Sequence, residues 1–197
     1  EEGCWLIVIK MAKIRDIRKK KIVREIDLPD GVNATINAGI LKVAGPKGES
    51  ARELKQHNIS VKIEGKKIIL ESSGGTKTDK KMMGSMVAHI KNMARGSTQN
   101  HTYVLKICSG HFPMNVSVTG GKFVVKNLLG EKVPRVLQLK ENTDVKIEGD
   151  MVYVTSASKE TAGQVSADIE QLTRRPGYDT RIFQDGIYII NKDGKEL

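Results

Sequence analysis

Apolar and charged positions alternate along two similar stretches of the chain. The pentapeptide VKIEG at 61–65 recurs at 145–149. One further alternating run follows each copy and two precede it; they lie at 67–71, 32–36 and 40–43 around the first copy, and at 151–155, 114–118 and 123–125 around the second. Alternation with a period of two residues is typical of strands with one buried face. Because the same order of runs occurs twice, we expect two copies of one strand-rich unit.

Each copy is expected to contain one helix with a single buried face. In the first helix, Thr78 and Asp79 are start signals, Gly96 is the stop, and the apolar stripe consists of Met83, Met86, Val87, Ile90 and Ala94. In the second, Ser158 is the expected cap and the stripe consists of Ala162, Val165, Ile169 and Leu172. Methionine at this spacing is typical of core packing. The pattern predicts an α+β fold of two tandem homologous domains, each a small, mainly antiparallel sheet packed against one helix.

Four parts of the chain follow from these patterns. A strand at 22–28 leads into the first copy, and the polar stretch 96–100 links the two copies. We expect a basic N-terminal arm, ordered or disordered, then a first and a second α/β repeat domain, and last a hairpin-like C-terminal extension with no counterpart in the first copy. Their predicted bounds are 1–24, 25–99, 100–173 and 174–197.

The charge of the chain points to a polyanionic partner. There are 33 Lys and Arg residues against 23 Asp and Glu, which gives a formal charge of +10. Eight of the basic residues lie between Lys10 and Arg24, where Asp16 is the one acid. Aromatic residues make up only 4% of the chain, which disfavours a binder of single strands built on stacking platforms. Folded or duplex RNA fits better. Met11 is a second candidate start, with 1–10 as an upstream extension.

No catalytic, metal or membrane motif emerges from the sequence. The glycine-rich segments lack the spacing of phosphate-binding loops and are expected to be turns. Ser156 and Lys159 have the Ser-x-x-Lys spacing of some hydrolases, but the companion motifs are missing. Cys4 and Cys108 cannot supply four thiolates, the four histidines are scattered, and the longest apolar run, 5–9, is too short to span a membrane. We expect no enzyme, cofactor, metal, membrane or small-molecule substrate, and a cytoplasmic location.

Cationic and aromatic residues are interspersed in the C-terminal extension. The pairs Pro176-Gly177 and Asp185-Gly186 are expected to break it into turns. Cations can meet phosphate oxygens, while tyrosine and arginine can stack on or hydrogen-bond to bases exposed in irregular RNA. We expect two groups of side chains: Phe183, Ile187 and Ile189 buried, and Arg174, Arg175, Tyr178 and Arg181 at the surface.

Two motifs carry a resemblance to a known family. The stretch 171–192, with RIFQDGIY at 181–188, resembles the C-terminal signature of the large-subunit ribosomal protein six family in its archaeal and eukaryotic form. The segment VAGPKG at 43–48 resembles the Gly-Pro-Lys-Gly turn of that family. The likeness covers roughly 25–192. It implies two homologous α/β domains and a role in the large ribosomal subunit near the sarcin-ricin region and the stalk base, with rRNA contacts mainly in the second domain.

Composition and resemblance place the RNA contacts in different halves of the chain. Local clusters outweigh net charge, because neutralisation depends on which cations reach the phosphates. We therefore predict a non-catalytic constituent of the cytoplasmic ribosome, with large-subunit rRNA and neighbouring ribosomal proteins, those of the stalk base among the candidates, as partners. The predicted rRNA-binding residues are Arg174, Arg175, Tyr178, Arg181, Lys122, Lys126, Asn127 and Lys132, with the arm and Lys47 in second place. The alternatives are a free RNA-binding protein outside the ribosome and a small hydrolase that uses Ser156 and Lys159.

Overall fold

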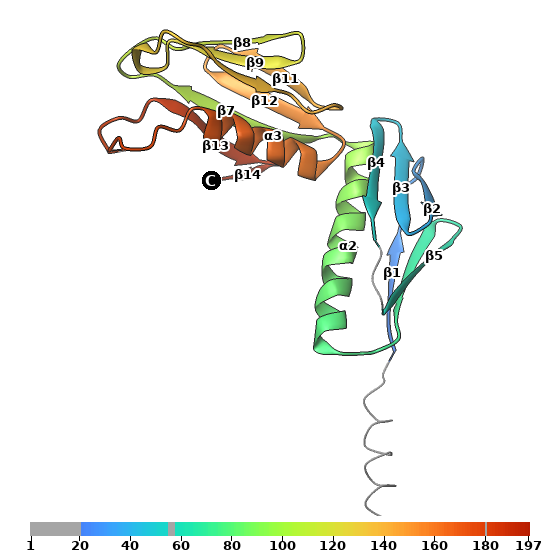
Figure 1. Ribbon diagram of the computed structural model, residues 1–197. Coiled ribbons are helices and arrows are strands. Elements are labelled where there is room, and N and C mark those ends of the chain that lie inside the picture. Colours follow the sequence, from blue (N-terminus) through green and yellow to red (C-terminus); the bar gives the residue numbers. More distant parts are fainter. Residues whose placement is uncertain (1–20, 55–57, 180) are drawn as a thin grey trace, which may run out of the picture. The chain divides into compact units, whose positions relative to one another are not determined.

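The computed structural model describes residues 21–54, 58–179 and 181–197. The chain divides into two compact units, with the boundary between Thr98 and Gln99 (Figure 1). The proposed start at Met11 lies outside the described residues, and so does most of the predicted basic arm. Strand β1 begins at Ile22, so the last three residues of that arm belong to the first unit's sheet.

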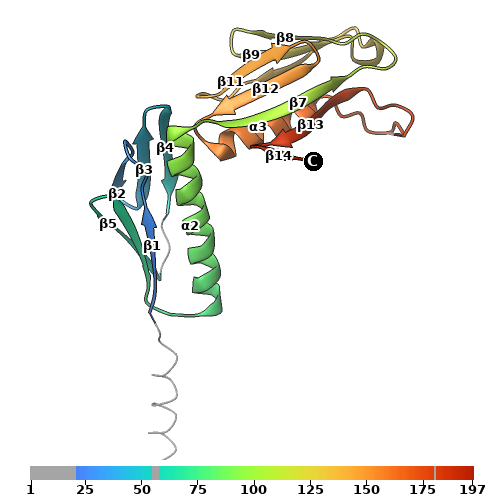
Figure 2. The same cartoon turned by 180° about the vertical axis from the view of Figure 1, so that it is seen from behind.

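The described part of the first unit contains two three-stranded antiparallel sheets and one α-helix. The sheets have the strand orders β1-β6-β5 and β2-β3-β4. Helix α2 packs on strands of both sheets (Figures 1 and 2). The elements are β1 (Ile22–Asp27), β2 (Asn33–Asn37), β3 (Ile40–Gly45), β4 (Gly48–Glu53), β5 (Ile59–Glu64), β6 (Lys67–Ser72) and α2 (Lys77–Thr98).

Alternation along the strands supplies the core of the first unit. Leu41 and Val43 of β3, together with Ile68 and Leu70 of β6, are fully buried beneath the helix. Burying each such side chain contributes about 1.5–3 kcal/mol. The predicted stripe of α2 faces this core, with its methionines buried as expected. The role of the methionines as packing residues is thus confirmed.

Helix α2 begins and ends two residues away from its predicted signals. The N–H of Asp79 donates to Thr76 Oγ1, and the N–H of Thr76 donates to Asp79 Oδ2, each over 3.1 Å. This reciprocal capping box makes Thr76 the cap instead of Thr78. The same hydrogen bonds, chiefly that from the Thr76 backbone, hold the pKa of Asp79 below its ordinary value. The helix passes Gly96 and ends at Thr98, because the hydroxyls that follow Gly96 bond back to helix carbonyls.

The second unit repeats this plan and extends it. Its sheets have the orders β11-β12-β7-β13-β14 and β10-β9-β8, and α3 packs on strands of both. Ser158 caps α3 as predicted: its side chain accepts a hydrogen bond from the N–H of Thr161. The elements are β7 (His101–Cys108), β8 (Asn115–Thr119), β9 (Lys122–Lys126), the 3-10 turn η1 (Leu128–Gly130), β10 (Arg135–Gln138), β11 (Asp144–Glu148), β12 (Met151–Ser156), α3 (Lys159–Leu172), β13 (Gly186–Lys192) and β14 (Lys195–Glu196).

The α+β class with tandem antiparallel units is confirmed, but each unit holds two sheets where one was predicted. The sequence analysis missed β4, β7 and β10. Charged residues interrupt the apolar alternation of β4, and β10 spans only four residues. It also treated the C-terminal extension as a separate part. Strand β13 instead pairs with β7 inside the five-stranded sheet, and turns back at Asp193 and Gly194 to pair with β14.

Contacts of the buried Asp193 carboxylate fix that last turn. His101 Nδ1 lies 2.9 Å from Asp193 Oδ2, and Lys159 Nζ lies 3.2 Å from the same oxygen. The side chains of His101 and Asp193 are 0% and 5% exposed. The backbone N–H of Asp193 also donates to the carbonyl of Thr102 over 3.0 Å. The extension is therefore held at its far end to the starts of β7 and α3.

Candidate nucleic-acid interface

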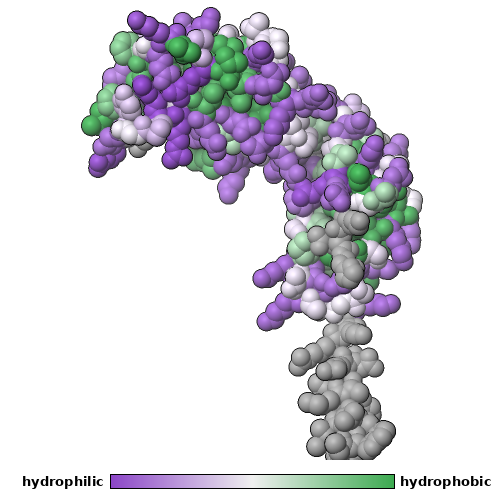
Figure 3. Space-filling view, viewed as in Figure 1, coloured by the Kyte–Doolittle hydropathy of each residue, from purple (hydrophilic) through white to green (hydrophobic). Residues whose placement is uncertain are grey.

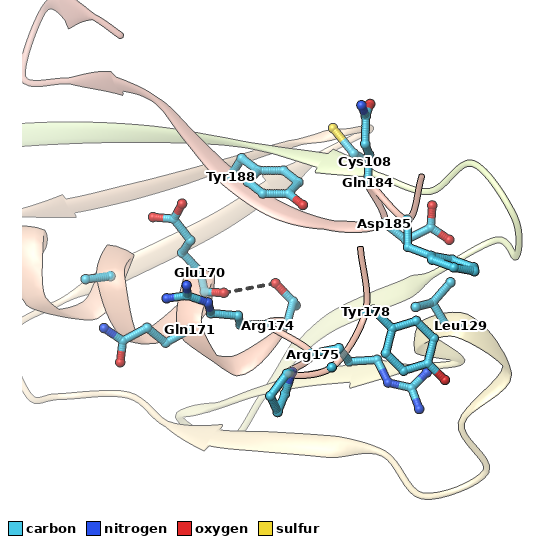
Figure 4. Close-up of a pocket in the computed structure, with 15 residues that line it drawn as sticks. Cys108, Leu129, Glu170, Gln171, Arg174, Arg175, Tyr178, Gln184, Asp185 and Tyr188 are labelled. Atoms are coloured by element: carbon cyan, nitrogen blue, oxygen red, sulfur yellow. Dashed lines mark hydrogen bonds between the residues drawn. The ribbon is translucent and has the colours of Figure 1, made fainter. Parts of the chain in front are cut away.

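The segment between α3 and β13 borders a hollow of about 1100 Å³, which we call the C-terminal hollow (Figure 4). The end of α3, the end of β7 and the start of β13 complete its walls. Of the predicted rRNA-binding residues, it brings together Arg174, Arg175 and Tyr178. Hydrophilic side chains cover much of the visible face of each unit (Figure 3).

Arg135 ties this segment to the end of α3. Its guanidinium donates to both carboxylate oxygens of Glu131, over 2.8 and 2.6 Å. It also donates to the carbonyls of Leu172, over 2.6 Å, and of Arg174, over 3.2 Å. The last carbonyls of a helix have no partner within the helix, so a cation here satisfies them and complements the helix dipole. The hydrogen bonds from Arg135 hold the pKa of Glu131 below its ordinary value.

A row of planar side chains follows along the segment. The guanidinium of Arg175 lies 4.4 Å from the ring centroid of Tyr178, and its Nε lies 3.4 Å from Glu131 Oε1. Tyr178 meets Phe183 edge to face at 5.1 Å, and Phe183 lies 5.2 Å from the ring of His111. Stacking and edge-to-face contacts of this kind fix the orientation of the side chains, which their closeness in the sequence does not determine.

Asp185 clamps this row to the loop after β7. Its carboxylate, only 4% exposed, accepts from the backbone N–H groups of Gly110, over 2.7 Å, and His111, over 3.3 Å. The His111 Nδ1 lies 3.2 Å from it. The predicted turn at Asp185-Gly186 is therefore wrong: the captured carboxylate directs the chain into β13. The turn at Pro176-Gly177 is present.

The Asp185 clamp is expected to open in acid. Burial raises the pKa of Asp185, but the hydrogen bonds from Gly110 and His111 outweigh burial and hold the pKa below its ordinary value. A carboxyl group whose pKa is lower in the folded protein than in the unfolded chain stabilises the fold fully at pH values above the unfolded-state pKa. This stabilisation is lost as the pH falls through the folded-state pKa. Below about pH 4 the Gly110 amide resonance should therefore move toward its unbonded position.

NMR titration of the Gly110 amide measures this change. Asp185→Asn should abolish the change of the Gly110 resonance at low pH, because the side-chain amide of asparagine does not titrate in this range. Asp179→Asn is the control, since Asp179 pairs with the exposed Arg181 and does not reach Gly110. An acid step that survives in Asp185→Asn would contradict the assignment to this carboxylate.

The four predicted binding residues of the C-terminal extension are exposed to solvent to different degrees. Arg174 is exposed and forms no side-chain ion pair among the described residues. Arg181 is 89% exposed and pairs with Asp179 Oδ2 over 2.9 Å. Tyr178 is 43% exposed, whereas Arg175 is half-buried. Ile187 is fully buried as predicted; Phe183 and Ile189, predicted to be buried, are only partly so.

None of the four predicted loop residues lines the hollow. Lys122 and Lys126 are exposed at the two ends of β9, and Lys132 is exposed in the loop before β10. Asn127 has a structural contact: its side-chain amide donates to the Pro113 carbonyl over 3.0 Å. In the first unit, Lys47 is exposed at the tip of the β3–β4 hairpin.

The residues of the hydrolase alternative have other partners. The Ser156 hydroxyl is buried and donates to the Asn142 carbonyl over 2.8 Å, while Lys159 pairs with Asp193. Within the described residues, no cluster of His, Cys, Asp or Glu could hold a metal ion. None of the helices in that part of the chain combines the length and the apolar character needed to cross a membrane.

The sequence analysis missed the residues that build this site. Glu131, Arg135 and Asp185 hold the cationic segment, yet Arg135 bonds carbonyls more than thirty positions away and Asp185 bonds amides more than seventy positions away. No local pattern marks such partners. The one available signal is the presence of charged residues within otherwise apolar stretches.

The fold defines a duplicated-domain protein of two tandem α+β repeats. The second repeat holds a cationic and aromatic segment at its surface, which is the surface chemistry of an RNA-binding protein. A family model described as Ribosomal protein L6 matches residues 28–100 and 112–186, one segment for each repeat. The chain belongs to this family, which confirms the resemblance seen in the sequence.

Curated relatives match the chain along most of their length. The large ribosomal subunit protein uL6 of Methanothrix thermoacetophila is 42% identical over 173 residues, which cover 88% of this chain and 98% of the relative. The uL6 proteins of Methanobrevibacter smithii and Methanococcus vannielii are 41% and 40% identical, over 87% and 89% of this chain and 97% of each relative.

Proposed function

We propose that this protein is a structural constituent of the large ribosomal subunit and binds large-subunit rRNA through its second unit. The observation that carries the proposal is the exposed cationic segment, tied to the fold through Arg135 and Asp185 at its two ends. Family membership supports the ribosomal setting. No catalytic step is part of the proposal.

The geometry assigns different tasks to the cationic residues. Arg174 and Arg181 project from the surface and are suited to phosphate oxygens. Arg175 and Tyr178 contact each other and form a planar surface beside them. A segment that is ordered before binding loses less conformational entropy on association. Lys122, Lys126, Asn127 and Lys132, with Lys47 and the basic arm in second place, would extend the contact to neighbouring rRNA.

The resemblance described in the sequence analysis supports a finer location as part of this proposal. We place the protein near the factor-binding region of the large subunit, beside the sarcin-ricin segment and the stalk base, in the cytoplasmic ribosome. Its protein partners would be neighbouring ribosomal proteins, with those of the stalk base as candidates. Crosslinking of the assembled subunit tests this location directly, since crosslinks confined to other rRNA segments would refute it.

Replacing Arg174 and Arg181 together by alanine should weaken binding to large-subunit rRNA and flatten its salt dependence. Each lost phosphate contact lowers the slope of log K against log salt by about 0.7–0.9. The fold should be unchanged, because neither guanidinium holds a buried partner. The measurement is equilibrium binding at several salt concentrations.

The matched control replaces Lys140 and Lys195, two exposed cations of the second unit outside the predicted set. It removes the same formal charge, so an equal loss in both variants would mean general electrostatic attraction and would count against the proposed site. Co-sedimentation with large subunits after a high-salt wash tests the alternative of a free RNA-binding protein.

A further inference from the structure

Helix α2 of the first unit exposes a face that is basic along its length. In Figures 1 and 2 the strands of this unit lie on one side of α2, and its exposed side chains lie on the other. Positions 77, 81, 84, 88, 91 and 95 are three or four residues apart, so they follow one line along the helix. The exposed residues include no acid and five bases, which we call the basic face: Lys77, Lys80, Lys81, Lys91 and Arg95.

The fold does not require these cations. Lys77, Lys80 and Lys81 lie at the N-terminal end of α2, where the helix dipole disfavours positive charge, and cations three or four residues apart repel each other. No ion pair with another described residue offsets the charge of these three lysines or of Lys91. Helix α3 has the same place in the second repeat, yet it carries one lysine and three acids. The charge of α2 therefore points to a polyanion outside the fold.

Small residues divide the basic face into two groups of cations. Gly84, Ser85 and Ala88 are exposed between Lys81 and Lys91. At a rise of 1.5 Å per residue, these two lysines are about 15 Å apart along the helix axis. Short side chains allow the middle of the helix to approach a surface closely, while the long lysine side chains reach charges on either side.

The β3–β4 hairpin adds a further cation at the end of α2. The N–H of Lys47 donates to the Ser97 carbonyl over 3.0 Å, and its side chain is exposed. The nearest acid of the hairpin points elsewhere. Glu49 follows Gly48 and precedes Ser50, whose cross-strand partner Val43 is buried in the core. Because neighbours in a strand point to opposite faces, Glu49 lies on the side of the sheet away from the helix.

Two groups of cations with small residues between them fit two phosphate backbones with a groove between them. The minor groove of an RNA duplex is wide and shallow, whereas that of B-DNA is about 6 Å wide, narrower than a helix about 10 Å across. We propose that the basic face of α2 docks on the minor groove of a double-stranded RNA segment, with Lys81 and Lys91 on opposite backbones. Gly84 and Ala88 then lie over the groove floor. This inference rests on the proposed function and adds a separate RNA contact in the first unit.

NMR titration of the full chain with a short RNA duplex tests this contact. The duplex should shift the amide resonances of 77–95, and the affinity measured at these resonances should be several times higher than for a DNA duplex of the same sequence. Replacing Lys81 and Lys91 together by alanine should weaken this binding about tenfold and lower the slope of log K against log salt by about 1.4–1.8. Thermal unfolding should not occur at a lower temperature, because repulsion within the helix is reduced.

Ala88→Gln tests the close approach separately from charge. A longer neutral side chain over the groove floor should weaken duplex binding several-fold and leave the salt slope unchanged. The charge control replaces Lys42 and Lys62 by alanine. These exposed lysines alternate with residues packed in the core and therefore point away from α2, so the affinity should stay nearly the same.

Four results would each overturn the inference: no shift at 77–95, equal affinity for RNA and DNA duplexes, equal losses in the two double-lysine variants, or full binding by Ala88→Gln. The proposed function is decided separately. Replacement of Arg174 and Arg181 should leave the titration at 77–95 unchanged, whereas it weakens binding to large-subunit rRNA through the second unit.

Discussion

Replacement of Arg135 by alanine is expected to destabilise the second unit by about 2–3 kcal/mol and to loosen the segment that follows α3. The substitution removes the two hydrogen bonds to Glu131 and leaves the Leu172 and Arg174 carbonyls without their charged donor. Because Glu131 also pairs with Arg175, the row of planar side chains should lose its support. Binding to rRNA should fall even though Arg135 itself touches no RNA in this proposal.

Denaturant unfolding and hydrogen exchange at 173–178 measure the two parts of this effect. Arg135→Lys should recover only part of the stability, since an ammonium cannot form the paired hydrogen bonds of the guanidinium fork. Arg181→Ala, which removes an exposed arginine of the same unit, should stay within about 0.5 kcal/mol of the parent. Equal stability of Arg135→Ala and Arg181→Ala would show that the network contributes nothing.

Replacement of Gly45 by alanine should destabilise the first unit by about 1–3 kcal/mol. Gly45 ends β3 where the hairpin meets the end of α2, and an added Cβ would lie 2.7 Å from the Ser97 carbonyl oxygen and 2.9 Å from the Ser97 Cβ. The N–H of Lys47 donates to that same carbonyl over 3.0 Å, so the hairpin cannot move away without losing the hydrogen bond. Thermal unfolding measures the loss.

Gly84→Ala is the matched control for the same helix. Gly84 is exposed within α2, and an added Cβ there meets no atom within 4 Å. Alanine should therefore stabilise the helix by about 0.5–1 kcal/mol through its higher helical propensity. Opposite signs for the two Gly→Ala variants would show that close contact at Gly45, and not glycine content, sets the requirement. Stabilisation by Gly45→Ala would contradict it.

The two repeats differ at one edge of a sheet. In both units the first strand pairs with the strand that directly follows the VKIEG strand: β1 with β6, and β7 with β12. Among the described strands β1 has no second neighbour, whereas β7 is covered by β13. The C-terminal extension thus uses a position that the first repeat also possesses. Pairing with β7 gives the extension a rigid base, from which the candidate RNA-contacting segment is displayed.

Local patterns predicted the duplicated plan and both helices. The repeated VKIEG segments became β5 and β11, and the stripe through Ala162, Val165 and Ile169 became the buried face of α3. The patterns failed where charge interrupts alternation, as in β4, and where a carboxylate is captured from afar, as at Asp185. The sequence identified the cationic residues by their type. It did not identify Glu131, Arg135 and Asp185, which hold the cationic segment in place.

The amino-acid sequence by itself determined the α+β class, the doubling of the unit and the family, because periodicity and short motifs depend on neighbouring residues. The tertiary structure alone decided that β13 joins the sheet, that Arg135 holds the end of α3, and that Glu170 and Tyr188 line one hollow with Arg174 and Arg175. Those relations arise from hydrogen bonds and packing between distant segments. Their partners are selected by distance in space, which no local pattern of residues records.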